Sequence, residues 1–345
     1  MKNNKITTVE QAVESLMDEN ITSKPYDYLF GDTADTYPKI NHELLELPGF
    51  YSRKESSRLY TQKNRTLEAD SISSVCPDGK KIFREATIDL EQETGPVKED
   101  KKEIIFEYAL QASFKYKKPC YPYIVTNHEY EEEFFDYCKE DIIIRMHLIV
   151  FDKKRVYKNI NTLNEKDFTK DEFTPYDLVR FKHCLVFAKM PYAIDVLEKL
   201  VELFTKIKII NVEIISDLFS SLNLMIQYHF RHDTKKIKEL LTMITEQIPK
   251  NQLNDVTKQA ELKNKLVASE NSNKEKDLII NEQGQALDQK DLIINEQGQA
   301  LDQKDLIINE QGQALDQKDQ ELNQKDHEIE KLKSILQKNN ITVMG

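Results

Sequence analysis

The clearest pattern along the chain is an alternation of apolar and polar side chains over residues 67–94. Two extended segments flank a turn of sequence PDGK, in which proline fixes the entry and glycine supplies a positive φ. In the second segment Asp89, Glu91 and Glu93 occupy every second position. Side chains two apart in a strand share a face. We therefore predict two paired strands, with these acids on one face and the intervening apolar side chains in a core.

The segments that follow predict the remainder of an α/β fold. Residues 98–117 repeat apolar side chains at three- and four-residue spacing, which predicts a helix. Residues 120–127 predict a buried strand, and 129–138, with sequence EYEEEFFDYC, a short acidic helix. Residues 141–152 are β-branched and apolar on both faces, as a central strand would be. The order strand, strand, helix, strand, strand predicts an α/β core.

Helices are expected on both sides of this core in the sequence. Residues 1–65 are polar and predict helical pieces, the first capped by Thr8. Residues 174–247 predict helices throughout, and Thr174 followed by Pro175 is typical of a helix start. The apolar stripes of these helices indicate packing around the core and not a cofactor site.

The C-terminal part is a repeat array. Residues 276–317 hold three identical copies of a 14-residue unit, and a degenerate continuation reaches about residue 338. Apolar residues recur every seven positions, which predicts a left-handed coiled coil that associates with a second copy through residues 276–338. A second row is mostly glutamine and lysine, and glycine in each copy costs about 1 kcal/mol of helix propensity. The apolar row is Ile280, Leu287, Ile294, Leu301, Ile308, Leu315, Leu322, Ile329 and Leu336.

Charge and cysteine usage narrow the class of protein. The net charge is −11, and residues 251–345 contribute −6 of it, with 12 Lys and Arg against 18 Asp and Glu. Neither part is basic, which argues against a broad, non-specific nucleic-acid surface but leaves room for a local basic groove. Four scattered cysteines without CxxC spacing predict reduced thiols. With no apolar leader and no long apolar run, we expect a cytoplasmic protein without membrane contact.

The two predicted strands carry the candidate chemistry. Asp70 belongs to the first strand region and Glu91 to the second, so their carboxylates should converge. Mg²⁺ prefers oxygen ligands and takes few of them from protein. Phosphodiester hydrolysis needs acids that hold the metal and a further group that positions the attacking water. The spacing is compatible with the Asp…Glu-x-Lys pattern of PD-(D/E)XK nucleases, and a solvated strand edge is the alternative interpretation.

The surrounding residues resemble the recombination-promoting nuclease (Rpn) family, also called PD-(D/E)XK nuclease family transposases. The resemblance covers about residues 25–155 and rests on the segments YDYLFGD, LEADSISSV, DGK, the strand with Glu91, the helix with Tyr108, and CYPYIV. It implies a restriction-endonuclease-like α/β core, Asp70 and Glu91 as ligands of Mg²⁺, DNA as partner, and a role in DNA recombination.

One position departs from the family pattern. Two residues after Glu91, where the family has lysine or glutamine, this chain has Glu93, which cannot donate a hydrogen bond when ionised. Three explanations remain open. Glu93 could bind a second metal, a nearby cation (Lys80, Lys81 or Arg84) could replace the missing lysine, or the site could be inactive. Asp89 is the alternative first acid. We take Asp70, Glu91, Glu93 and Lys81 as the candidate catalytic residues.

These observations predict a magnesium-dependent DNA endonuclease. We expect an N-terminal helical segment (1–65), a PD-(D/E)XK-like core (66–160), a helical region (161–250) and a coiled-coil tail (251–345). The alternative function is a catalytically inactive scaffold with a nuclease fold that oligomerises through its tail.

Overall fold

The computed structural model describes residues 6–17, 25–60, 66–208 and 211–338, without the side chains of residues 60, 66–67 and most of 266–314. The chain divides into two compact units, residues 1–272 and 273–345. The first unit is α/β, with a mixed six-stranded sheet, and the described part of the second is helix. No helix among the described residues has the length and apolar character needed to cross a membrane.

The sheet has the strand order β1-β4-β5-β6-β8-β7, which places β5 and β6 in its centre. The strands β1, β4 and β5 pair antiparallel, β5, β6 and β8 pair parallel, and β7 pairs antiparallel to β8. The strand bounds are β1 Phe50–Lys54, β4 Ser71–Cys76, β5 Ala86–Glu93, β6 Cys120–Thr126, β7 Phe134–Lys139 and β8 Ile142–Val150, and a separate ribbon pairs β2 Arg58–Tyr60 with β3 Thr66–Glu68.

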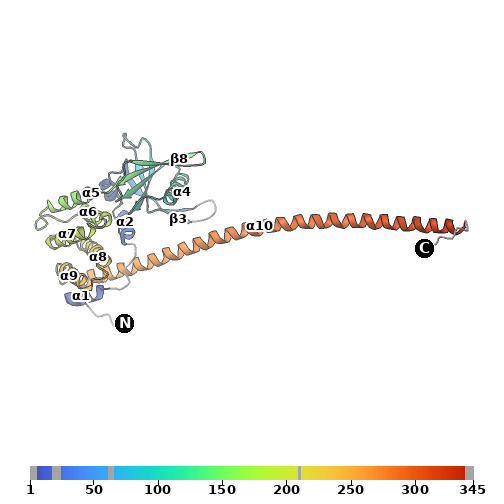
Figure 1. Cartoon of the computed structure of the whole chain (residues 1–345). Coiled ribbons are helices and arrows are strands. Elements are labelled where there is room, and N and C mark those ends of the chain that lie inside the picture. Colours follow the sequence, from blue (N-terminus) through green and yellow to red (C-terminus); the bar gives the residue numbers. More distant parts are fainter. Residues whose placement is uncertain (1–5, 18–24, 61–65, 209–210, 339–345) are drawn as a thin grey trace. The chain divides into compact units, whose positions relative to one another are not determined.

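Helices cover both faces of the sheet. Helix α4 lies on one side of it, and a stack of helices lies on the other (Figure 1). The helix bounds are α1 Val9–Leu16, α2 Pro25–Thr36, α3 Pro38–Leu44, α4 Glu99–Tyr116, α5 Lys153–Asn164, α6 Pro175–Phe187, α7 Ala193–Lys206, α8 Val212–His229, α9 Thr234–Thr245 and α10 Leu253–Lys338.

Most of the predicted elements are present with the expected starts. Thr8 and Thr174 each form a capping box at the first residue ahead of α1 and α6, and Pro175 opens α6. Such caps satisfy backbone N–H groups that have no partner inside the helix. The main core joins residues of all three expected regions, including Ala12, Ile88 and Leu200. The regions 1–65, 66–160 and 161–250 are therefore one structural unit.

Four predicted elements differ from the structure. The N-terminal segment 1–65, predicted as helical pieces, also contains the strands β1 and β2. The first predicted strand is divided into β3 and β4, which belong to different sheets, and Asp70 lies between them. Residues 129–138 do not form an acidic helix. Their second half is β7, because Phe135 and Tyr137 alternate toward the α4 side, where they pack in an apolar cluster. The strand over 141–152 is not central, since only β7 separates it from the sheet edge. Its first residues, Ile142 and Ile143, are exposed, so their apolar character does not report burial here.

A buried charge network joins four helices of the first unit. The side chain of Lys182 on α6 is fully buried, and its Nζ lies 2.6 Å from carboxylate oxygens of both Asp32 on α2 and Asp217 on α8. Lys263, near the start of α10, contacts the same two acids at 3.2 and 2.6 Å. Two ammonium groups thus face two carboxylates, which keeps the buried set neutral.

We expect Lys182→Ala to lower the free energy of unfolding by about 3 kcal/mol or more, because it leaves two partly buried carboxylates with one cation. Lys199→Ala is the matched control, since Lys199 pairs with Asp195 at the surface and should cost less than about 1 kcal/mol. Urea denaturation of both variants measures the difference. Equal losses would show that the buried network contributes no more than a surface pair.

Candidate active site

The structure places Asp70 directly beside Glu91. In the antiparallel pair of β4 and β5, Ser71 is opposite Leu90, so the preceding residue, Asp70, meets Glu91. The carboxylate of each acid accepts a hydrogen bond from a backbone N–H of the neighbouring strand region. Asp70 N donates to Glu91 Oε1 at 2.9 Å, and Gln92 N donates to Asp70 Oδ2 at 2.8 Å. The two acids are therefore fixed relative to each other by the backbone of both strands.

A lysine from helix α4 completes this group. Lys101 Nζ lies 2.7 Å from Glu91 Oε2. The Glu91 side chain is 1% exposed and that of Lys101 is 25% exposed, so the pair is buried on the acid side and reachable from solvent on the lysine side. Asp70 is exposed. The site thus contains two carboxylates and one ammonium group, contributed by the end of a turn, a central strand and a helix.

Lys101 is the residue that the sequence prediction missed. The helix side that packs on the sheet carries Ile105, Tyr108 and Ala112, all on the face predicted to be apolar. Lys101 is one helical turn ahead of Ile105 and belongs to the same stripe. The sequence did indicate that Lys101 needs a partner, because a charged residue in line with an apolar helix face is buried where the helix meets the sheet.

The predicted cation, Lys81, is elsewhere. Its backbone N–H donates to Asp78 Oδ1 in the turn before β5, and its charge helps lower the pKa of His147 on β8, after the larger effect of burial. Glu91 lies five positions beyond the first strand residue, Ala86, which is about 16 Å along a strand. The structure therefore brings Lys101, and not Lys81, to the acids.

The burial of Glu91 changes its protonation. Burial, together with the charge of Asp70, raises the pKa of Glu91 to about 7, although Lys101 opposes the shift. Burial alone would lower the pKa of Lys101, but Glu91 and Asp70 raise it above its ordinary value. Lys101 therefore remains an ammonium ion while Glu91 can exchange a proton near neutral pH.

The other two acids of β5 lie at different depths. Asp89 is fully buried, and neither of its carboxylate oxygens receives a hydrogen bond from a described residue. Burial and the charges of Glu91 and Asp70 raise its pKa well above the ordinary value, which favours the neutral acid. Glu93 is partly exposed at the end of the strand, and burial raises its pKa too. The acid row is thus no solvated strand edge: β5 is central and α4 covers it.

The carboxylates of Asp70 and Glu91 are the type of ligand that Mg²⁺ prefers, but the site offers only a few of them. Among the described residues, no three His, Cys, Asp or Glu side chains are grouped so that they could hold a metal ion. Mg²⁺ sites often use only one or two carboxylates and complete the shell with water. Both Glu91 oxygens accept hydrogen bonds here, and one of these donors is Lys101. A metal on Glu91 Oε2 would replace that contact.

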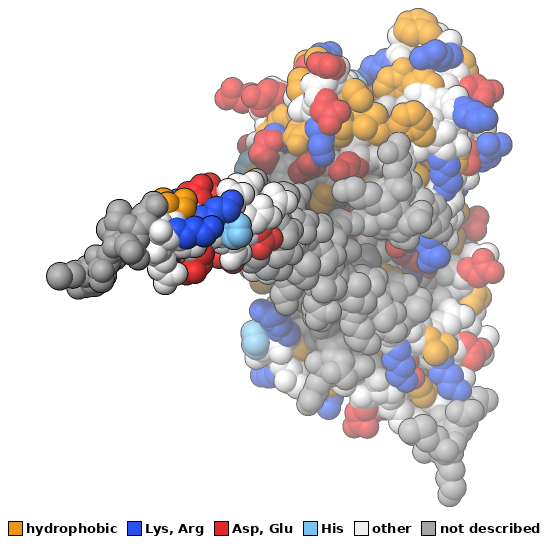
Figure 2. Space-filling view, turned by 90° about the vertical axis from the view of Figure 1, so that its right-hand side faces the viewer, with side chains coloured by type: hydrophobic (Ala, Val, Ile, Leu, Met, Phe, Trp, Pro, Cys, Tyr) orange, Lys and Arg blue, Asp and Glu red, His pale blue; other side chains and the backbone are white. Residues whose placement is uncertain are grey.

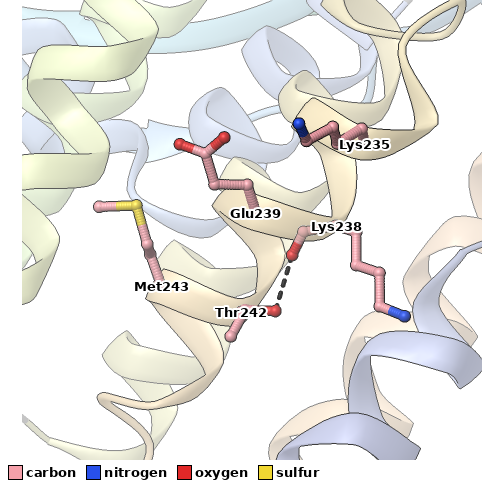
Figure 3. Close-up of a pocket in the computed structure, with 5 residues that line it drawn as sticks. All are labelled: Lys235, Lys238, Glu239, Thr242 and Met243. Carbon is pink, nitrogen blue, oxygen red and sulfur yellow. Dashed lines mark hydrogen bonds between the residues drawn. The ribbon is translucent and has the colours of Figure 1, made fainter.

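Two other features of the described residues offer less chemistry. His229 Nε2 lies 3.1 Å from the Tyr26 hydroxyl, whereas His232 is exposed and accepts a hydrogen bond from Arg231, so the two histidines of the HxxH pair have separate partners. A surface hollow of about 410 Å³ on α9 is lined by Lys235, Lys238, Glu239, Thr242 and Met243 (Figure 3). Its one hydrogen bond among these residues joins Thr242 Oγ1 to a helix carbonyl, as in ordinary helix surfaces.

No family model matches the chain, and neither a curated protein nor a solved structure matches it.

The raised pKa of Glu91 predicts a pH-dependent stability. The pKa is 4.5 for an unperturbed glutamate and about 7 in the fold, so the folded state holds this proton more tightly. Stability should therefore fall as the pH rises through this window. Glu91→Gln has no such proton to lose. The difference in free energy of unfolding between the variant and the wild type should therefore shift by about 3 kcal/mol in favour of the variant from roughly pH 4 to pH 8.

Urea denaturation of wild type and Glu91→Gln across this pH range measures the gain. Glu85→Gln is the control, because Lys118 lowers the pKa of the exposed Glu85, which confines its effect to acid pH, so its difference from wild type should stay nearly constant between about pH 5 and pH 8. A pH-independent difference between Glu91→Gln and wild type would contradict the buried, proton-exchanging glutamate.

Proposed function

We propose that this chain is a magnesium-dependent DNA endonuclease of the PD-(D/E)XK type. The observation that carries the proposal is the contact of Lys101 Nζ with Glu91 at 2.7 Å, beside Asp70. It supplies the acid, acid and lysine set that such chemistry needs, with the lysine on α4 instead of two residues after the glutamate. DNA as the substrate rests on the family resemblance of residues 25–155.

Each residue has a role that its surroundings support. Asp70 and Glu91 would hold Mg²⁺, which when bound supplies Lewis acidity and a water of lowered pKa. Lys101, which despite its burial is kept as an ammonium ion by Glu91 and Asp70, would leave Glu91 Oε2 to the metal and stabilise negative charge on a phosphate at the exposed side of the site. Glu93 lies on the same strand face, nearer to solvent, and its raised pKa suits it to accept the proton of the attacking water.

The surface charge agrees with a confined contact to DNA. The face in Figure 2 carries Lys and Arg side chains interspersed with Asp and Glu, and hydrophobic side chains gather over the sheet part at the top of the view. Such a surface gives little salt-dependent, non-specific affinity. Binding would then depend on the site and its immediate rim.

A plasmid-nicking assay with Mg²⁺ tests the assignment. We expect Asp70→Ala, Glu91→Ala and Lys101→Met each to lower the cleavage rate by about 100-fold or more, since each removes charge at the reacting phosphate. Lys102→Met is the matched control on the same helix, because Lys102 pairs with Glu99 and not with Glu91. Lys81→Met should also retain activity.

The outcome separates this function from its alternative. If wild type and the three site variants nick the plasmid equally, or none does so, the endonuclease assignment is wrong. The alternative is an inactive scaffold that acts through its tail, and the feature in its favour is Glu93 at the position where the family has lysine or glutamine. Circular dichroism of each variant shows whether a lost activity reflects lost folding.

We also propose that α10 associates with a second copy of this chain. In the described part of its second half, Leu315, Leu322 and Ile329 are exposed apolar residues at seven-residue spacing. The same row in residues 276–310 lies outside the described side chains. A solitary helix with such a stripe leaves apolar area in water that pairing would bury. Two nuclease sites in one assembly would allow both DNA strands to be cut.

Sedimentation of the full chain tests this association. We expect wild type to be oligomeric and the double variant Leu322→Asp/Ile329→Asp to shift to monomer, because each places charge in the buried seam. Ser334→Asp, five positions after Ile329 on the outward side, should leave the oligomer unchanged. A monomeric wild type at micromolar concentration would rule out the association.

A further inference from the structure

The tail contains two kinds of sequence that differ in what they can specify. Residues 276–317 are three identical copies of one unit, and residues 318–338 are not repeated. Helix α10 runs through both without interruption. When one identical helix slides along another by one repeat unit, about 21 Å, each repeated side chain meets the same partner type as before. The repeats therefore define the pairing face but not the stagger.

The non-repeated end distinguishes the aligned pair from the staggered ones. In the repeats the second row of the seam is glutamine or lysine, and at the end it becomes apolar at Leu332. Leu332 is 59% exposed in the single helix, and Ile329 beside it is 47% exposed. Together with Leu336 they make both rows of the seam apolar at this end of the helix. Figure 2 shows hydrophobic side chains beside acidic and basic ones on this end of α10.

We propose that the tail pairs with a second copy of itself in parallel, and that residues 318–338 fix the two chains in register. In the aligned parallel pair Leu332 meets Leu332 of the second copy. After a slip of one repeat unit, one Leu332 meets Lys318 of the second copy, and the end of the other copy loses its partner over the length of one repeat. Both changes return apolar surface to water or bury it against an ammonium group.

The parallel orientation follows from the same residues. An antiparallel pair would set the apolar end of each chain against the polar second row of the other chain's first repeats, such as Gln283 or Lys290. When the tails pair over their full length, only the parallel pair places Ile329, Leu332 and Leu336 against their own kind. The repeats then contribute most of the buried contact area, and the C-terminal end sets the register, as single core positions do in other coiled coils.

Disulfide trapping between two marked full-length chains tests the register. One chain carries Leu322→Cys and the other Ile308→Cys, both in the apolar row and separated by the length of one repeat unit. Parallel aligned pairs form 322–322 and 308–308 disulfides, and pairs slipped by one repeat unit form 308–322 disulfides. After equilibration and oxidation, peptide mass spectrometry counts each species. We expect the aligned disulfides to exceed the slipped ones by about tenfold or more.

A second pair of variants isolates the role of Leu332. Adding Leu332→Lys makes the second row polar throughout, so the share of 308–322 disulfides should rise at least severalfold. Ser334→Lys adds the same charge on the outward side and should change nothing. As many slipped as aligned disulfides in the chains with Leu332 would overturn the register proposal, and the absence of any 322–322 disulfide would overturn the parallel orientation.

The inference does not depend on nuclease activity, but it does rest on self-association. Sedimentation of the same samples separates the two failures. A monomer shows that the tail does not pair and ends the proposal at that point. An oligomer with mixed disulfides shows that it pairs without a fixed stagger.

Discussion

The burial of carboxylates inside the sheet is the constraint that explains most of the site. Asp89 and Glu91 lie on the central strand β5 with exposed fractions of 0 and 1%. A carboxylate taken from water into such surroundings is costly unless it is paired or protonated. The chain uses both solutions, since Lys101 pairs with Glu91 while the pKa of Asp89 is raised toward the neutral acid. Helix α4 must therefore pack where it does, with its lysine facing the strand.

This arrangement gives the buried pair an unusual protonation behaviour. A glutamate with a pKa of about 7 beside a permanently charged lysine can change protonation without losing its partner. The exposed Asp70 leaves one side of the group open to solvent. Strongly perturbed pKa values cluster at functional sites, and this is the physical support for the catalytic use proposed above.

The same rule of compensated charge recurs away from the site. Lys182 is fully buried on α6 and is balanced by Asp32 and Asp217, which in turn hold Lys263 at the start of α10. This network ties the first turns of the last helix to the body of the first unit. Among the described residues beyond that point, the helix shows exposed apolar side chains such as Leu322 and Ile329 in place of such an anchor.

Local patterns in the sequence were sufficient for the elements whose side chains obey one period. The turn at Asp78, the caps at Thr8 and Thr174, the helix over 98–117 and the helices after residue 174 follow from nearest-neighbour chemistry, and the structure contains them. The convergence of Asp70 and Glu91 was also expected, because the two segments follow each other along the chain and one face of each has to meet the core, which restricts their register.

What the sequence determined, then, was the set of local elements and the two acids; tertiary structure decided their environment. Alternation could not reveal that β5 lies in the centre of the sheet, so a solvated strand edge remained the alternative to a metal site, although Asp89 and Glu91 are buried. Residues 129–138 were predicted as a helix because their many acids obscure the alternation of Phe135 and Tyr137. That alternation corresponds to burial only because α4 packs against this side of β7. Lys101 could not be assigned because its partner is a strand residue ten positions earlier, and only the packing of helix on sheet brings the two charges together.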